Sequence, residues 1–169
     1  EPAAVRGGFD SISAAAKERL AGRLFPIAEQ ETTDFDKALR SIAAPFVLGL
    51  GFAGARLDHG LAVLNALVRA PERRALILSP QDVTFLAPLQ MELALPTGTR
   101  LSLFPMGAVE AESSGLRWPL QGLKFAPDGM IGTSNEVSGP VRLRFSAAKM
   151  LVILPVRYLP EALRGLGCR

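Results

Sequence analysis

Apolar residues in the first half of the chain follow two kinds of spacing. Some recur every three or four positions, which predicts amphipathic helices at residues 11–24, 33–42 and 57–68. Others form continuous runs, which predict a short strand or connector at residues 25–28 and buried strands at 46–50 and 75–78. Apolar strands that alternate with helices predict a largely parallel sheet covered on both faces.

From about Val83 onward, the apolar spacing changes to every second residue. Apolar and polar side chains alternate at residues 89–95 and 141–145, as in strands with one buried face. The pattern predicts an antiparallel sandwich or barrel, with a domain boundary near residues 80–83. Turn signals rich in glycine, proline and serine occur at residues 96–98, 113–115, 121–122, 127–129 and 138–140.

Composition and charge narrow the class of protein. Hydrophobic residues make up 49% and charged residues 21%, a balance typical of a packed globular protein. The net charge of +3 is scattered along the chain, so no nucleic-acid partner is expected. No apolar run approaches the about 20 residues that span a bilayer, so no membrane partner is expected. The single cysteine, Cys168, cannot form an intramolecular disulfide, and we expect a soluble, cytoplasmic protein.

Acidic residues of the first half lie where a parallel sheet forms its ligand-binding crevice. Asp10 follows a possible strand, Asp34 opens the second predicted helix and Asp58 opens the third. Loops and helix starts at the carboxyl ends of parallel strands line such a crevice, and converging carboxylates suit Mg²⁺. The residues alone leave another interpretation open, in which Asp34 and Asp58 only stabilise helix N-termini through the macrodipole.

A glycine-rich loop between the predicted strand 46–50 and the third helix offers a different function. Gly49, Gly51 and Gly54 match the G-x-G-x-x-G spacing of dinucleotide-binding loops. The next predicted strand, however, is followed by Ser79-Pro80-Gln81, without the acidic residue that would bind a ribose. A dinucleotide-binding protein is therefore a remote alternative.

Six short motifs follow one another along both halves of the chain. They are Gly7-Gly8-Phe9-Asp10-Ser11, Glu29-Gln30-Glu31-Thr32-Thr33-Asp34, Gly54-Ala55-Arg56-Leu57-Asp58-His59, Ser102-Leu103-Phe104-Pro105, Gly115-Leu116-Arg117-Trp118-Pro119-Leu120 and Gly132-Thr133-Ser134-Asn135-Glu136. In this order they resemble the thiamine pyrophosphokinase family, over residues 7–154. The resemblance implies a Rossmann-like parallel α/β catalytic domain over residues 1–81, lacking its usual start, and an antiparallel β-sandwich thiamine-binding domain over residues 82–169.

The resemblance also implies an activity and the residues that carry it. It would make the chain a thiamine diphosphokinase, which transfers pyrophosphate from ATP to the hydroxyl of thiamine and releases AMP. Mg²⁺ would be required, and a homodimer would share its active sites between subunits. Catalysis would involve Asp10, Asp34, Asp58 and Arg56, with Asp10 and Asp34 as metal ligands and Asp58 as a hypothetical base. The implied ATP-binding residues are Gln30, Thr33, Arg56 and Asp58, and the implied thiamine-binding residues are Trp118, Ser134, Asn135 and Gln30.

The chain departs from the family pattern in two main respects, besides a smaller change at Ala55. Gly8 stands where the family motif carries a second aspartate, and the chain begins at Glu1, without the segment that usually opens the family. These departures leave a second function open, a non-catalytic homologue that binds thiamine or a nucleotide. Apart from its motif, a lone tryptophan such as Trp118 would be expected in the core of the sandwich.

Overall fold

The computed structural model describes residues 4–7, 12–27, 33–53 and 56–168. The chain forms two compact units, Glu1–Ala43 and Ala44–Arg169. Within the described ranges, the helices are all too short or too polar to cross a membrane.

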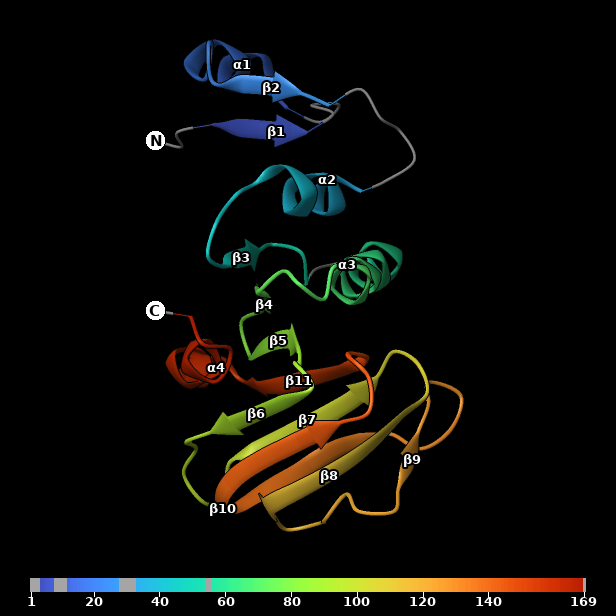
Figure 1. Cartoon of the computed structure of the whole chain (residues 1–169). Helices are drawn as coiled ribbons and strands as arrows, with labels where there is room; N and C mark the ends of the chain where they lie inside the picture. The colour runs from blue at the N-terminus through green and yellow to red at the C-terminus, as the bar shows by residue number, and fades with distance from the viewer. Residues whose placement is uncertain (1–3, 8–11, 28–32, 54–55, 169) are drawn as a thin grey trace. The chain divides into compact units, whose positions relative to one another are not determined.

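The first unit contains a pair of short parallel strands with a helix between them in sequence (Figure 1). β1 (Val5–Gly7) pairs with β2 (Leu24–Pro26), and α1 (Ala14–Arg19) connects them. The helix is shorter than the one predicted over residues 11–24. A turn that contains Gly22 at a φ of 80° follows it, and glycine in this conformation is a common way to end a helix before a strand.

α2 (Asp34–Ser41) confirms the second predicted helix. Thr33 is its N-cap, and the Thr33 side chain accepts a hydrogen bond from the backbone N–H of Asp36 (3.3 Å). Phe35 and Leu39, four positions apart, are both buried, as the apolar spacing predicts. The start of this helix is therefore set by a capping hydroxyl and its burial by one apolar stripe.

The second unit begins with a parallel strand pair joined by a helix. β3 (Val47–Leu50) and β4 (Ala75–Leu78) pair in parallel, and α3 (Leu57–Arg69) connects them, which confirms the predicted elements. The next strand, β5 (Asp82–Leu86), pairs with β4 in the antiparallel direction, so the sheet is mixed. The predicted domain boundary between residues 81 and 82 falls within this continuous sheet and stays a prediction.

The strands in the rest of the second unit are antiparallel, which confirms the prediction made from the two-residue apolar spacing. The strand order is β3-β4-β5-β11-β7-β10-β8-β9, and β6 pairs with the later part of β10 (Figure 1). A short 3-10 helix (Val156–Tyr158) and α4 (Leu159–Gly165) follow the last strand. The strands are β6 (Gln90–Leu93), β7 (Arg100–Pro105), β8 (Val109–Leu116), β9 (Lys124–Phe125), β10 (Gly132–Phe145) and β11 (Met150–Pro155).

β10 passes from one layer of the sandwich to the other. Its first residues pair with β7, and residues 141–145 pair with β6 and β8. The register shifts between Gly132 and Asn135 on the β7 side and between Val137 and Arg142 on the β8 side. Such irregularities let a strand bend at the corner of a sandwich. The fold class is therefore confirmed as an α/β portion followed by an antiparallel β-sandwich.

An apolar core lies between the two layers. One layer contributes Phe85, Leu103 and Met150, and the other contributes side chains of β6, β8 and β10, such as Leu143. α4 lies beside β6 (Figure 1), and Ala162 of this helix is fully buried in the same core. The C-terminal helix is thus part of the sandwich and helps to shield its apolar side chains from water.

Gly115→Ala is expected to destabilise the protein more than Gly98→Ala. Both glycines have positive φ values, 74° and 85°, so alanine strains the backbone at each position by about 1–2 kcal/mol. At position 115, however, the new Cβ would overlap the carbonyl group of Pro140, whereas nothing lies within 4 Å at position 98. We expect Gly115→Ala to lower the free energy of unfolding by about 3 kcal/mol or more, measured by urea denaturation. Equal losses for the two variants would contradict this close approach of β8 to β10.

Candidate functional site

A small pocket lies beside Trp118, between the segment after β8 and the start of β10. Its volume is about 160 Å³, less than the about 300–1,000 Å³ of complete small-molecule sites. It therefore suits one ring of a ligand better than a whole nucleotide. The lining residues are Trp118, Pro119, Leu120, Leu123, Phe125, Ile131, Gly132, Thr133 and Asn135.

The indole of Trp118 is half-exposed, and a buried amide holds its backbone in place. Trp118 is 52% exposed, so it is not the core residue that a lone tryptophan would suggest. Asn135 is 6% exposed; its Oδ1 accepts from the Trp118 N–H (3.2 Å) and its Nδ2 donates to the Trp118 carbonyl (2.7 Å). Asn135 Oδ1 also accepts from the N–H of Glu136 (2.8 Å). The amide thus anchors the tryptophan segment to β10.

A positive charge already lies on the face of this indole. The guanidinium carbon of Arg117 is 4.8 Å from the ring centroid of Trp118, within the range of a cation–π contact. The same guanidinium lies 3.5 Å from a carboxylate oxygen of Glu136. The ring is thus half-exposed to solvent, and one of its faces already carries a cation.

Ser134 has an unusual backbone and an exposed side chain. Its φ is 62°, the one positive value at a residue other than glycine in the described ranges. Its N–H donates to Ser102 Oγ (2.9 Å). Thr133 and Asn135 line the pocket, whereas Ser134 is not among the lining residues, and its predicted contact with thiamine stays a prediction. Thr133 was missed by sequence reasoning although it belongs to the same quoted motif.

Arg56 and Asp58 form a bidentate ion pair at the start of α3. Arg56 Nη2 lies 2.6 Å from Asp58 Oδ2, and Arg56 Nε lies 3.2 Å from Asp58 Oδ1. Both side chains are exposed. Hydrogen bonding to the guanidinium lowers the pKa of Asp58 below its ordinary value. A lowered pKa makes this carboxylate a weaker base, so the pair presents a positive group held in a defined orientation.

The remaining predicted site residues belong to the first unit. Thr33 caps α2, and the exposed Asp34 has its Oδ1 3.9 Å from the Lys37 ammonium. Asp10 and Gln30 lie outside the described residues. Over the described ranges, no group of three or more His, Cys, Asp and Glu side chains could hold a metal ion. A metal site that includes Asp10 and Asp34 therefore stays a prediction.

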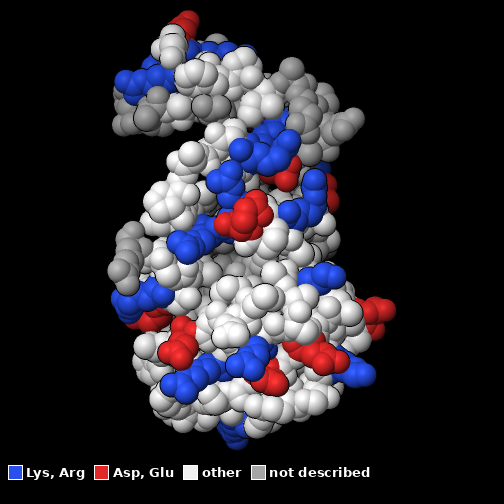
Figure 2. Space-filling view, in the orientation of Figure 1, with Lys and Arg blue, Asp and Glu red and all other residues white. Residues whose placement is uncertain are grey.

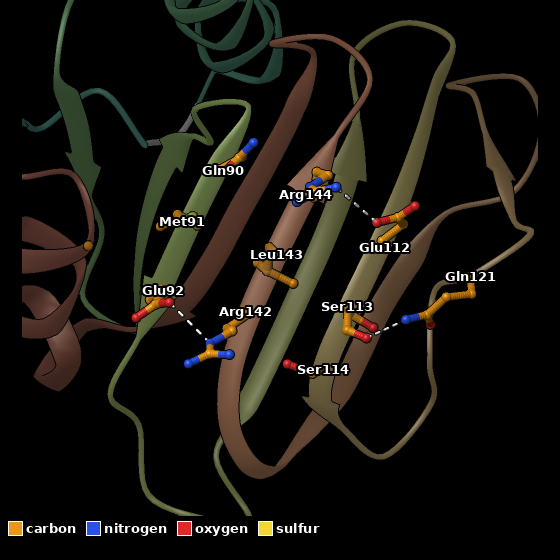
Figure 3. A pocket seen from close by; sticks show the side chains of 11 residues that line it. Gln90, Met91, Glu92, Glu112, Ser113, Ser114, Gln121, Arg142, Leu143 and Arg144 are labelled. Atoms are coloured by element: carbon orange, nitrogen blue, oxygen red, sulfur yellow. Dashed lines mark hydrogen bonds and ion pairs between the residues drawn. The ribbon is translucent and has the colours of Figure 1, made fainter.

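A larger hollow, of about 610 Å³, lies on the outer face of β6, β10 and β8 (Figure 3). Charged side chains on this face pair across the strands: Arg142 with Glu92 (3.1 Å) and Arg144 with Glu112 (3.8 Å). On the face shown in Figure 2, positive and negative side chains are likewise interspersed. This hollow has the character of a solvated strand surface, because its charges are balanced by their neighbours.

Two family models match the chain. The catalytic domain of thiamin pyrophosphokinase matches residues 1–78, and the vitamin B1 binding domain of thiamin pyrophosphokinase matches residues 88–150. Arg56 and Asp58 lie in the first match. The pocket beside Trp118 lies in the second.

Plant proteins are similar to most of the chain. Thiamine pyrophosphokinase 1 of Oryza sativa subsp. japonica is 30% identical over an alignment of 158 positions, gaps included, which covers 81% of this chain and 60% of the relative. Thiamine pyrophosphokinase 2 of the same plant is 30% identical over an alignment of 179 positions, gaps included, which covers 94% of this chain and 67% of the relative. The chain thus spans about 60% of the length of the first of these relatives.

Solved structures share the fold. Thiamine pyrophosphokinase from Bacillus subtilis has a TM-score of 0.74 at 20% identity, over 91% of this chain and 78% of that chain. Yeast thiamin pyrophosphokinase has a TM-score of 0.74 at 17% identity, over 94% of this chain and 71% of that chain. Both likenesses support the architecture described above.

Arg56→Gln is expected to raise the pKa of Asp58 toward its ordinary value. The substitution removes the hydrogen bond that contributes most to the lowered pKa. Carboxyl ¹³C NMR across an acid titration measures the change directly. Arg69→Gln is the control, because it removes the same charge at the opposite end of α3, about 18 Å along the helix axis. A titration of Asp58 that is the same in both variants would contradict the pairing.

Proposed function

Because this chain belongs to the thiamine pyrophosphokinase family, we propose that it transfers pyrophosphate from ATP to the hydroxyl of thiamine, giving thiamine diphosphate and AMP. The observation that carries the proposal is the half-exposed indole of Trp118 beside an apolar pocket. It lies within the stretch that matches a vitamin B1 binding domain. A flat aromatic face suits thiamine, which is both aromatic and cationic.

The pocket beside Trp118 is the proposed site of a thiamine ring. Leu120, Phe125 and Ile131 supply apolar walls, and Thr133 and Asn135 add polar residues to the lining. The buried Asn135 amide is already bonded to backbone groups, so we assign it the role of holding Trp118 in place. We further propose that Ser134 and Gln30 contact thiamine, as the family resemblance implies.

Transfer of a pyrophosphoryl group from ATP requires protein groups that neutralise the negative charge of the phosphates. Arg56 offers an exposed guanidinium whose orientation is held by two hydrogen bonds to Asp58, and we propose that it contacts these phosphates. We assign Asp58 mainly to orienting Arg56, because both of its carboxylate oxygens accept hydrogen bonds from the guanidinium. Gln30 and Thr33 complete the proposed ATP-binding set.

One described carboxylate of the first unit is of the kind that binds Mg²⁺. Asp34 presents an exposed carboxylate in the first turn of α2, and carboxylate oxygens are the ligands that this hard cation prefers. We propose that Asp34 and Asp10 hold Mg²⁺. When bound, the ion would neutralise charge on the ATP phosphates.

We also propose that the protein acts in the cytoplasm. We propose further that it forms a homodimer in which each active site is shared between the two subunits. Three large apolar side chains are exposed at or next to the pocket: Trp118, Met130 and Ile131 are 52%, 48% and 43% exposed. Exposed apolar groups that gather at one place are typical of surfaces that a ligand or partner covers. A second subunit that covers thiamine at this rim would explain them.

The direct test is thiamine-dependent release of AMP from ATP. We expect AMP to form when the purified chain receives thiamine, ATP and Mg²⁺ together, and no AMP when thiamine is omitted or EDTA is added. Thiamine binding without AMP release would refute the transfer and support the non-catalytic homologue instead.

Trp118→Ala is expected to raise the KM for thiamine about tenfold, because stacking and cation–π contacts are worth about 1–2 kcal/mol. The KM for ATP should change little. Trp118→Phe keeps an aromatic face and should recover part of the loss. Leu89→Ala is the control, since Leu89 is also 52% exposed and lies outside the pocket. Equal thiamine KM values for Trp118→Ala and Leu89→Ala would remove Trp118 from the site.

A further inference from the structure

An extra residue in β10 decides which of its side chains face the pocket. Gly132 pairs with Leu103 of β7, and Asn135 pairs with Leu101. Three steps along β10 therefore match two steps along β7. In a regular strand, residues three apart point to opposite faces. The bulge allows Gly132 and Asn135 to lie on the same face as Leu103 and Leu101, which are fully buried.

Ser134 accommodates this extra residue. Its φ of 62° is a left-handed conformation that disfavours most side chains and persists only where the surroundings impose it. A bulge interrupts the hydrogen bonds of the ladder. The Ser134 N–H instead donates to the side chain of the neighbouring strand, at Ser102 Oγ (2.9 Å).

Ser102 lies opposite the bulge, between Leu101 and Leu103, which pair with the residues on either side of it. It is 4% exposed, and a buried hydroxyl is unfavourable unless it is hydrogen-bonded. Besides the Ser134 N–H, Ser102 Oγ accepts from Arg100 Nη1 (3.4 Å). The Arg100 guanidinium in turn pairs with the carboxylate of Asp82 at the start of β5. The Ser102 hydroxyl therefore accepts hydrogen bonds from both Arg100 and Ser134 at the point where the ladder between β7 and β10 is interrupted.

We propose that Ser102 is a positioning residue for the Trp118 pocket. Its Oγ stabilises the bulge at Ser134, the bulge turns Asn135 to the buried face, and the Asn135 amide holds the backbone of Trp118. Without the Oγ acceptor, the left-handed conformation of Ser134 loses its support, and the anchor of Trp118 loosens. The inference deepens the proposed function and rests on it for the thiamine measurement, but the position of Trp118 can be measured without any ligand.

The test compares Ser102→Ala with Ser146→Ala in the full chain. Ser146 Oγ accepts a backbone N–H from Glu110 at 2.9 Å, so the control removes the same kind of bond at the opposite end of β10. Trp118 is the only tryptophan, and its emission and acrylamide quenching report on the pocket. We expect Ser102→Ala to increase quenching and to raise the Kd and KM for thiamine about five- to tenfold, the effect of one lost hydrogen bond. Its kcat and the KM for ATP should stay near the wild-type values.

Two further variants keep the test decisive if Ser102→Ala does not fold. Ser102→Thr retains the side-chain oxygen. Ser102→Val has nearly the same shape as the threonine variant but lacks this oxygen. We expect the threonine variant to be closer to the wild type in both quenching and thiamine Kd, since only the acceptor differs between the two.

The outcomes separate this inference from the proposed function. A wild-type chain that binds no thiamine refutes the proposed function, and the quenching comparison then decides the role of Ser102 alone. Unchanged quenching in Ser102→Ala, or an equal increase in Ser146→Ala, would overturn the inference. Equal behaviour of the threonine and valine variants would overturn it as well.

Discussion

The hydrogen bond between the Ser134 N–H and Ser102 Oγ joins β10 to β7 at the register shift in the first part of β10. β10 belongs to both layers, so any error in its register would turn its side chains to the wrong face. The register irregularity at Ser134 turns Asn135 inward, and Asn135 positions Trp118. The bulge in β10 thus determines the position of Trp118 in the candidate site.

Much of the fold could be predicted from apolar spacing. The 3.6-residue period located α2 and α3, the continuous run at residues 75–78 located β4, and the change to a two-residue period marked the start of the sandwich. The bulge in β10 could not be predicted, because residues 132–136 show which strand they form only when β7 is beside them. Helix α1 was predicted too long, because apolar periodicity continues through the turn that contains Gly22.

The candidate site was predicted less completely than the fold. The motif around Trp118 drew attention to an indole that the structure leaves half-exposed, and the motif around Asn135 drew attention to a side chain that serves the backbone. Sequence spacing could not distinguish these roles, since they depend on which atoms the amide reaches. Thr133 and Ser102 were both within quoted motifs, yet only the pairing of β7 with β10 shows why they matter.

Buried polar side chains are concentrated at this same strand pair. In the described part of the second unit, the buried polar side chains are Thr99, Ser102 and Asn135, and all three lie on β7, next to it, or on β10. Each is hydrogen-bonded: Thr99 Oγ1 to the hydroxyl of Tyr158 (3.3 Å), Ser102 Oγ to the backbone N–H of Ser134, and the Asn135 amide to the backbone of Trp118. Apolar packing alone tolerates small shifts, whereas a buried polar group must keep its partner. At Asn135 this requirement falls on the residue that holds the backbone of Trp118, which is where the proposed flat cationic ring would need a fixed surface.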